Sequence, residues 1–366
     1  MSVKNRAAIV RIGNSDALAL FSADLLWRPV GAVLADALVG AGVERLLIVT
    51  NEAPPESLLS AAHETCLIPH GARDRYIDFI RDTDAAVFFT LPALIDAEPL
   101  SELFSCAAHL GPTILTSGGE HVAFGLSGSA LVEGHELLDN IIADCPSGFR
   151  VLEHTSGGLC MPVRNLSELS RAENLCRDRV NARLMASGVR IIGPETCYIA
   201  EDAQIEPGAT ILPGTIIRTG CSVGAGTQLG PYVYIREHCH IGRGCRIGDF
   251  VELKNANIAD GTKVSHLTYV GDADVGERVN FGCGTVTVNY NGGTKSRTVI
   301  GDDAFIGCNT NLVAPVTVGA RAYTAAGSTV THDVPEGALA ISRSHQVNKE
   351  GYGDRLMKKF KEEKKQ

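Results

Sequence analysis

The chain has 366 residues, of which 45% are hydrophobic and 20% charged, and its formal net charge is −9. This length allows two domains that each bury a sizeable core, and the negative charge argues against nucleic acid as the main partner. No apolar run approaches the roughly 18 residues of a membrane-spanning helix, and eleven cysteines without a CxxC pair predict reduced thiols in a cytoplasmic protein.

Residues 1–166 alternate between strand-like and helical segments. The apolar runs AAIVRIG (7–13), RLLIVT (45–50) and AAVFFTLPALI (85–95) predict strands. VGAVLADALVGAG (30–42) predicts a helix between the first two of them. Such alternation favours a mostly parallel sheet flanked by helices.

A single long helix is predicted over residues 167–188. Asn165 and Glu168 have the spacing of a capping box at its start, and Gly188 is a natural stop at its end. Apolar residues recur between them at helical spacing. We interpret this helix as the connector between two domains.

From residue 199 onward an aliphatic residue recurs at every sixth position. The series runs unbroken from Ile199 to Leu253, continues with two five-residue steps to Phe281, and returns from Ile300 to Val318. A small or β-branched residue nearly always follows four positions later, and glycine often follows directly. This hexapeptide pattern is the signature of a parallel β-helix, a triangular prism with 18 residues in each coil. We assign it to residues 189–343, followed by a charged tail over 344–366.

Three cysteines fill the small position of this repeat, namely Cys221, Cys239 and Cys245. Core packing accounts for all three. Cys221 and Cys239 are eighteen residues apart, so they should stack on adjacent coils, where a cytoplasmic protein would keep them reduced.

The six-residue period fails between residues 281 and 300, where NYNGGTKSR (289–297) predicts a loop that leaves the coil. Arg236 and Lys254 lie one coil apart at equivalent outward positions, so their charges should repel unless an anion lies between them. Lys295 and Arg297 in the loop could close over the same place. On position alone, two solvated surface cations are an equal alternative.

His266 also takes an outward position. Alone it would be an ordinary surface histidine, although a neutral imidazole can act as a general base. His238 and His240 form an HCH sequence, and we weigh zinc there below the simpler reading of neighbouring surface positions.

The motifs HLTYVGDA (266–273), NYNGG (289–293) and LVAPVTVG (312–319) carry a resemblance to a known family. From Ile192 to Tyr352 the chain resembles, in register, the acetyltransferase half of the bacterial bifunctional glucosamine-1-phosphate N-acetyltransferase/N-acetylglucosamine-1-phosphate uridyltransferases. The resemblance implies a left-handed prism and a homotrimer with sites between subunits. It also implies acetyl-CoA-dependent N-acetylation of glucosamine-1-phosphate, a step toward UDP-N-acetylglucosamine and the cell wall.

The resemblance implies roles for particular residues. His266 would be the general base that takes a proton from the substrate amine, and no metal would be needed. The phosphate and sugar would be bound by Arg236, Lys254, Tyr269, Asn280 and Lys295. Acetyl-CoA would be contacted by Cys283, Asn289, Tyr290, Cys308, Ala326 and Arg343. Cys283 and Cys308 stand where more familiar members carry small residues such as alanine or serine.

The front half departs from the same family. WRPVGAVLADALVGAGVERLLIVT (27–50) resembles the framework of its nucleotidyltransferase domain, a Rossmann-like fold. The glycine-rich loop and lysine that hold nucleotide phosphates are missing, FFTLPALIDAEPL (88–100) lacks the Mg²⁺-binding aspartate in place, and Arg164 replaces a metal-binding asparagine. We therefore expect a degenerate domain without uridyltransferase activity, and a role for Mg²⁺ only if that activity were retained.

Two alternatives to the leading hypothesis remain open at this point. One is N-acetylation of a different amino sugar phosphate, since small changes around Tyr269 and Asn280 would suffice. The other is a non-catalytic trimeric scaffold or regulatory protein that presents the divergent front domain.

Overall fold

The computed structural model describes residues 3–364 except 60, 72, 134, 156 and 157. Contacts within the chain divide it into two compact units, Met1–Ser187 with Gly193–Ala203, and Gly188–Ile192 with Gln204–Gln366. The first unit is an α/β domain and the second is a parallel β-helix, so both predicted fold classes are confirmed.

The first unit is built on a seven-stranded sheet. Its strands are β1 (Arg6–Arg11), β4 (Arg45–Val49), β5 (Glu64–Ile68), β6 (Ala85–Phe89), β8 (Thr113–Ser117), β9 (Glu120–Leu126) and β10 (Arg150–Glu153). They lie in the order β10-β8-β9-β6-β1-β4-β5, and β9 runs antiparallel to both of its neighbours. The short strands β2 (Asp24–Leu25) and β3 (Arg28–Pro29) form one further pair, and β7 (Ala93–Ile95) and β11 (Cys160–Pro162) form another.

Alternate residues of each strand point to opposite faces of the sheet. Both faces carry buried apolar residues, and helices cover both. These helices are α1 (Ser15–Ser22), α2 (Val30–Gly40), α3 (Glu56–Leu59), α4 (Arg73–Ile80), α5 (Ala97–Leu110), α6 (Gly128–Glu133) and α7 (His135–Ile142). Val10 of β1 belongs to the same core as Leu34 of α2, whereas Ile9 belongs to the core that contains Tyr76 of α4. The predicted apolar run at 85–95 is split into β6 and β7.

The predicted connector is the helix α8 (Leu166–Ala186). Asn165 Oδ1 accepts a hydrogen bond from the Glu168 amide at 3.0 Å, and Gly188 follows with φ of +96°. The Glu168 carboxylate reaches back to the amide of Arg164, one residue before the position that a capping box uses. Contacts assign α8 to the first unit, where Ala172 packs with Leu25 and Val30. The short helix η1 (Pro194–Thr196) and strand β13 (Tyr198–Ile199) also belong to this unit.

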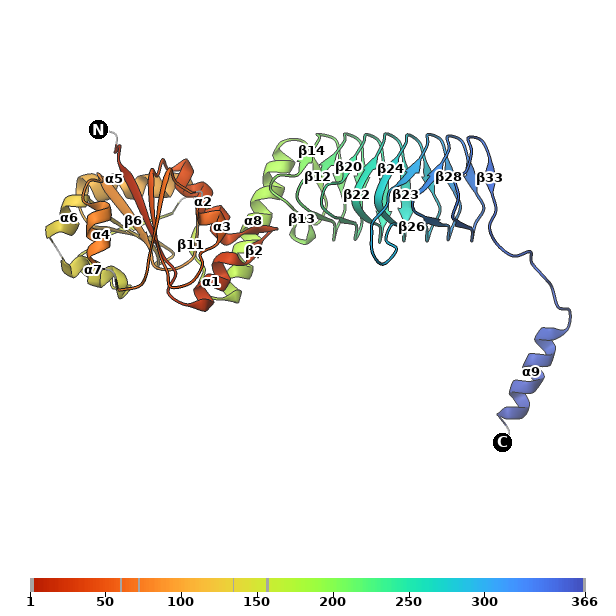
Figure 1. Cartoon of the computed structure of the whole chain (residues 1–366), viewed down its shortest axis with the longest axis horizontal. Coiled ribbons are helices and arrows are strands. Elements are labelled where there is room, and N and C mark those ends of the chain that lie inside the picture. Colours follow the sequence, from red (N-terminus) through yellow and green to blue (C-terminus); the bar gives the residue numbers. More distant parts are fainter. Residues whose placement is uncertain (1–2, 60, 72, 134, 156–157, 365–366) are drawn as a thin grey trace. The chain divides into compact units, whose positions relative to one another are not determined.

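The second unit stacks its coils through three columns of parallel strands (Figure 1). The first column contains β12 (Arg190–Ile191), β15 (Thr210–Ile211), β18 (Gln228–Leu229), β21 (Arg246–Asp249), β23 (Lys263–His266), β25 (Asn280–Phe281), β28 (Phe305–Ile306), β31 (Tyr323–Thr324) and β33 (Leu339–Ala340). The second contains β16 (Ile216–Ile217), β19 (Tyr234–Ile235), β22 (Glu252–Ile258), β24 (Tyr269–Val275), β26 (Val286–Val288), β29 (Asn311–Val313) and β32 (Thr329–Val330). The third contains β14 (Gln204–Ile205), β17 (Ser222–Val223), β20 (His240–Ile241), the later halves of β22 and β24, β27 (Thr298–Ile300) and β30 (Val316–Val318).

The six-residue series fills the interior of this prism, as predicted. Ile211, Leu229 and Ile247 are fully buried on successive coils. Gly248 shows why glycine follows the aliphatic residue: a Cβ there would lie 1.9 Å from the Ser265 carbonyl oxygen of the next coil. The close approach of the coils therefore excludes a side chain at this position.

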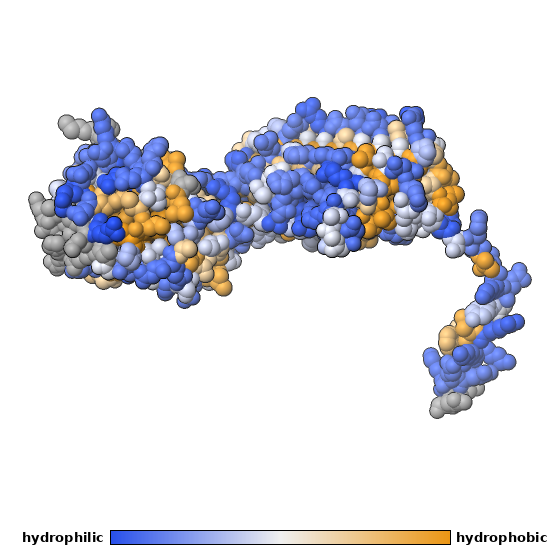
Figure 2. Space-filling view, viewed as in Figure 1, coloured by the Kyte–Doolittle hydropathy of each residue, from blue (hydrophilic) through white to orange (hydrophobic). Residues whose placement is uncertain are grey.

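The loop over residues 289–297 leaves the coil between β26 and β27, as its composition predicts (Figure 1). After the last coil, the tail forms the helix α9 (Tyr352–Glu363), all of whose residues are exposed. Leu356, Met357 and Phe360 are exposed hydrophobic residues of this helix, and apolar surface is visible on it in Figure 2. Among the helices that the structure describes, none is long and apolar enough to span a membrane.

The close packing at Gly248 can be tested by adding one methyl group. Gly248→Ala should lower the free energy of unfolding by about 1–3 kcal/mol, because the methyl group must push two coils apart. Gly293→Ala is the control, since a Cβ there would meet only the flexible Asn291 side chain at 3.7 Å. Urea denaturation of both variants should show a lower midpoint for Gly248→Ala alone. Equal midpoints would contradict the packing described here.

Candidate active site

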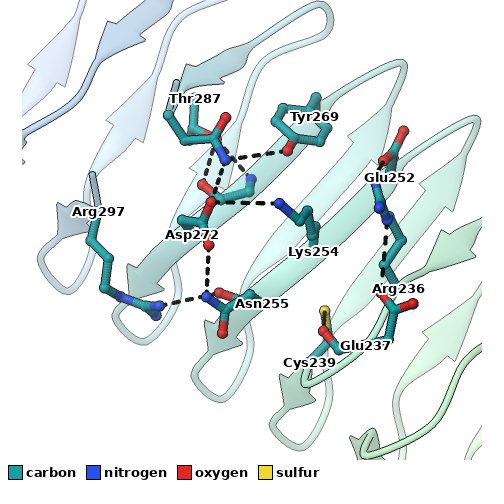
Figure 3. A network of polar contacts seen from close by, with 12 residues as sticks. Arg236, Glu237, Cys239, Glu252, Lys254, Asn255, Tyr269, Asp272, Thr287 and Arg297 are labelled. Carbon is teal, nitrogen blue, oxygen red and sulfur yellow. Dashed lines mark hydrogen bonds and ion pairs between the residues drawn. The ribbon is translucent and has the colours of Figure 1, made fainter. Parts of the chain in front are cut away.

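Arg236 and Lys254 lie side by side on adjacent coils, as their spacing predicts. Strands β19 and β22 pair Ile235 with Leu253, so the two cations that follow are neighbours. Arg236 Nη1 donates a hydrogen bond to Glu252 Oε1 at 3.2 Å, and this carboxylate raises the pKa of Arg236 (Figure 3).

A polar network forms at the two corners where the repeat shortens to five residues. Asn255 and Asp272 occupy these corners with φ of +45° and +46°. Asn255 Nδ2 donates to Asp272 Oδ1 at 2.6 Å, and Asn289 Nδ2 donates to the other carboxylate oxygen. Lys254 Nζ lies 3.8 Å from Asp272 Oδ2, and Asn289 Nδ2 lies 3.4 Å from the Tyr269 hydroxyl. Asp272 thus ties three predicted site residues together (Figure 3).

The Asp272 carboxylate is held in its ionised form. Burial acts to raise its pKa, but the hydrogen bonds from Asn255 and Asn289 and the charges of Lys254 and Lys295 lower the pKa of Asp272 overall. No sequence pattern predicts this role, because the position of Asp272 in the repeat is that of one more outward residue.

Positive charge accumulates around Lys254. The Lys295 ammonium lowers the pKa of Lys254, and desolvation acts in the same direction, while Asp272 opposes both. Within the part of the chain that the structure describes, Lys295 forms no ion pair with a carboxylate. An anion bound between these ammonium groups would relieve their repulsion.

Arg297 lies at the border of this network, where Asp274 holds its guanidinium and the Asn255 carbonyl accepts a further hydrogen bond from it (Figure 3). Its guanidinium donates to both oxygens of Asp274 at 2.8 and 2.6 Å. Nη1 also donates to the Asn255 carbonyl at 3.3 Å. Arg297 therefore fastens the loop to the coil, and the adjacent Lys295 is the loop cation near Lys254.

His266 lies directly before the turn at Leu267, where φ is +44°, and its side chain is exposed. Its Nδ1 is 2.7 Å from Asp249 Oδ1, and this contact lowers the pKa of Asp249. A carboxylate can only accept a hydrogen bond, so Nδ1 carries the proton and the lone pair lies on Nε2. The pair has the chemistry of an oriented general base.

His266 shares one edge of the β-helix with residues that the resemblance assigns to acetyl-CoA. Strands β21, β23, β25, β28 and β31 pair in register along this edge. Every residue of the edge stands directly before a turn residue with a left-handed backbone. This edge column consists of Asp249, His266, Cys283, Cys308 and Ala326. The Arg343 side chain reaches its end, since Cδ lies 3.8 Å from the position of a Cβ on Gly327.

The remaining predicted residues are less closely connected. Asn280 lies on β25 in register with Lys263 and Phe305, on the neighbouring sheet, and among the described contacts none links its side chain to Lys254. Tyr290 is exposed, its backbone bridges Lys295, and its hydroxyl donates to the Gly292 carbonyl at 2.7 Å.

The first unit also contains a cavity lined by charged side chains. This cavity of about 180 Å³ contains Arg28 and Arg179, but Arg28 pairs with Asp36 and Glu201, and Arg179 pairs with Asp96. Its cations are therefore already neutralised. Three or more His, Cys, Asp or Glu side chains grouped to hold a metal ion do not occur among the residues that are described.

The repeat region matches a family of known proteins. The family model described as bacterial transferase hexapeptide (six repeats) matches residues 220–255 and 297–332. The bifunctional protein GlmU of Clostridium botulinum (strain Langeland) is 47% identical over 234 residues, which cover 54% of this chain and 51% of the relative. GlmU of Brevibacillus brevis is 45% identical, covering 55% of this chain and 51% of the relative.

The chain therefore spans about half the length of the curated relatives it matches. A structure of CMP:2-keto-3-deoxy-manno-octonic acid synthetase complexed with CTP covers 48% of this chain and 99% of its own, at 11% identity and a TM-score of 0.34. The resemblance to the bifunctional family that the motifs indicated is confirmed.

The role of Asp272 can be tested through the pH dependence of stability. Its pKa is lowered on folding, so its contribution is present above the unfolded value near 4 and is lost as the pH falls through the folded value. Asp272→Asn should lower the free energy of unfolding by about 1–3 kcal/mol at pH 7, since hydrogen bonds to a charged group are lost. The difference from the unmodified protein should shrink below about pH 4.

Chemical denaturation at pH 7 and pH 3 measures this difference. Asp354→Asn in the exposed helix α9 is the matched control and should follow the unmodified protein at both values. A loss of stability in Asp272→Asn that is equally large at both pH values would contradict a role for the ionised carboxylate.

Proposed function

We propose that this chain, whose repeat domain is related to the GlmU proteins, is an acyltransferase that moves the acetyl group of acetyl-CoA to the 2-amino group of glucosamine-1-phosphate. One observation carries the proposal: the ammonium groups of Lys254 and Lys295, only partly offset by Asp272, and an oriented, exposed histidine at His266 occur in the same β-helix. The product, N-acetylglucosamine-1-phosphate, would feed the synthesis of UDP-N-acetylglucosamine and cell-wall precursors in the cytoplasm.

His266 supplies the general base in this proposal. Its Nε2 accepts a proton from the substrate amine as the nitrogen attacks the thioester carbonyl of acetyl-CoA. The tetrahedral intermediate then collapses and expels the coenzyme A thiolate. Asp249 accepts the Nδ1–H hydrogen bond throughout, so it keeps the lone pair on Nε2 and stabilises the imidazolium that forms. Asp249 is thus a positioning residue.

The substrate phosphate fits the cations Lys254, Lys295 and Arg236. A phosphate dianion between the two ammonium groups would offset the repulsion that lowers the pKa of Lys254. Tyr269 belongs to the same network through Asn289 and would face the sugar. Asn280 would contact the sugar from the neighbouring sheet.

Acetyl-CoA would lie along the edge column, with Cys283, Cys308 and Ala326 beside it and Arg343 near its phosphates. Asn289 and Tyr290 would border its acetyl end. Acetyl transfer by this route uses only the base and the cations, so it requires no metal ion. A homotrimer with sites between subunits is part of the same proposal.

We further infer that the first unit does not catalyse uridyl transfer. The segment after β1 lacks the glycine-rich loop and lysine of the bifunctional family. Arg164, at the position of a metal-binding asparagine, forms ion pairs with Glu120 and Glu168. A guanidinium there would repel Mg²⁺ rather than hold it.

The role of His266 is tested by mutation. His266→Ala should lower kcat for acetylation of glucosamine-1-phosphate by roughly 10²–10⁴-fold, the usual contribution of a general base, with little change in KM. Release of the coenzyme A thiol measures the rate. Lys263→Ala, an exposed residue of the same strand, is the control and should retain full activity. Full activity in His266→Ala would refute the assignment.

The specificity of the enzyme and the state of its first unit are tested with other substrates. Among a panel of amino sugars and their phosphates, glucosamine-1-phosphate should give the highest kcat/KM, because the cations bind its phosphate.

With UTP, N-acetylglucosamine-1-phosphate and Mg²⁺, no pyrophosphate should be released. Pyrophosphate release that depends on enzyme would contradict a degenerate first unit, and faster acetylation of another amino sugar would reassign the substrate.

A further inference from the structure

Cys283 and Cys308 occupy equivalent turns on adjacent coils. Strands β25 and β28 pair Phe281 with Ile306, so continuing the register two residues places the cysteines opposite each other. The Asn309 amide donates to the Cys283 carbonyl at 2.8 Å, which holds the two turns together. Neighbouring parallel strands lie about 4.8 Å apart, and a disulfide requires Cα atoms about 4.4–6.8 Å apart. The usual spacing of stacked coils therefore lies within the Cα range that a disulfide requires.

Neither of these two cysteines is buried. Cys308 is exposed and Cys283 is half-buried. Thiol–disulfide exchange requires a thiolate that an oxidant can reach, so access decides which cysteines react.

A second stacked pair provides the comparison within the same β-helix. Cys221 and Cys239 are neighbours through the pairing of Ser222 with His240, but they point into the core with exposed fractions of 3% and 0%. The neighbouring Cys221 thiol and burial raise the pKa of Cys239. The two pairs thus share their stacking and differ in access.

Four other cysteines are less suited to exchange. Burial raises the pKa of Cys160 and of Cys176 to about 12. Burial also raises the pKa of Cys106 and of Cys245. Cys66, which is partly exposed on β5, serves as a control below.

We propose that Cys283 and Cys308 are a site of reversible oxidation that forms a disulfide between adjacent coils. The oxidant is a low-molecular-weight disulfide. One cysteine thiolate attacks it, forming a mixed disulfide and releasing one small thiol. The other cysteine thiolate attacks the protein sulfur of that mixed disulfide and releases the second small thiol. Two protein thiols are oxidised, and the small disulfide is reduced to two thiols.

The disulfide would act on acetyl-CoA, and this consequence rests on the proposed function. Both cysteines belong to the edge column that begins with Asp249 and His266. A crosslink would draw the two turns together where the coenzyme is proposed to lie. The oxidised protein would therefore bind acetyl-CoA more weakly and transfer acetyl groups more slowly, and a reducing agent would reverse both effects.

The test treats the reduced full-length protein with glutathione disulfide at pH 8, blocks remaining thiols with N-ethylmaleimide, and maps the peptides by mass spectrometry. The peptides that contain Cys283 and Cys308 should be recovered joined, and Cys221 and Cys239 should remain thiols. Calorimetry with acetyl-CoA and the thiol-release assay should both show a loss in the oxidised protein that dithiothreitol restores.

Two variants give the comparison. Cys308→Ser cannot form the crosslink, so its acetyl-CoA binding, relative to its own untreated value, should not respond to glutathione disulfide. Cys66→Ser should respond as the unmodified protein does. The proposal is overturned if the joined peptides are absent, if Cys221 and Cys239 are joined instead, or if the crosslink forms without affecting acetyl-CoA binding. Because mapping and calorimetry do not require turnover, failure of the proposed acetyl transfer would remain a separate result.

Discussion

The stacking of successive coils at one fixed spacing is the constraint on which the candidate site depends. Each backbone amide of a strand donates to the coil beside it, so residues one coil apart become immediate neighbours. The rise per coil is too short for a side chain where glycine is required, as at Gly248. The same rise brings Arg236 beside Lys254 and Asp249 beside His266. A rigid repeat therefore sets side-chain distances without help from a deep cavity.

Departures from the repeat supply the chemistry. Two five-residue corners bring Asn255 and Asp272 together, and the loop after β26 carries Lys295 toward Lys254. Asp272 neutralises only part of the charge, so the regular scaffold holds a local excess of cations on a chain of net negative charge. An electrostatic imbalance of this kind is costly unless a ligand offsets it, which is why it indicates binding rather than packing.

The period of the sequence predicted the inward residues and the stacking of Arg236 on Lys254, because both follow from a six-residue count. It did not predict Asp249. A regular coil of eighteen residues would place Gly248 beside His266. One five-residue step between them shortens this coil to seventeen residues, so Asp249 is the neighbour of His266. The contact of Arg297 with Asp274 was missed since loop conformation is not periodic. In the first unit, helix and strand positions followed from alternation, whereas the antiparallel β9 depends on long-range pairing that no local pattern reports.

In the proposed site, an anion binds between the ammonium groups of Lys254 and Lys295. Bound glucose-1-phosphate should raise the lowered pKa of Lys254 back toward its ordinary value near 10.5, so binding at alkaline pH below that value should take up protons. Calorimetry in buffers of different ionisation enthalpy measures that uptake directly. The unmodified protein should take up protons on binding, and Lys254→Met should take up none. Binding without any proton uptake, or equal uptake by both proteins, would contradict an anion site between the two ammonium groups.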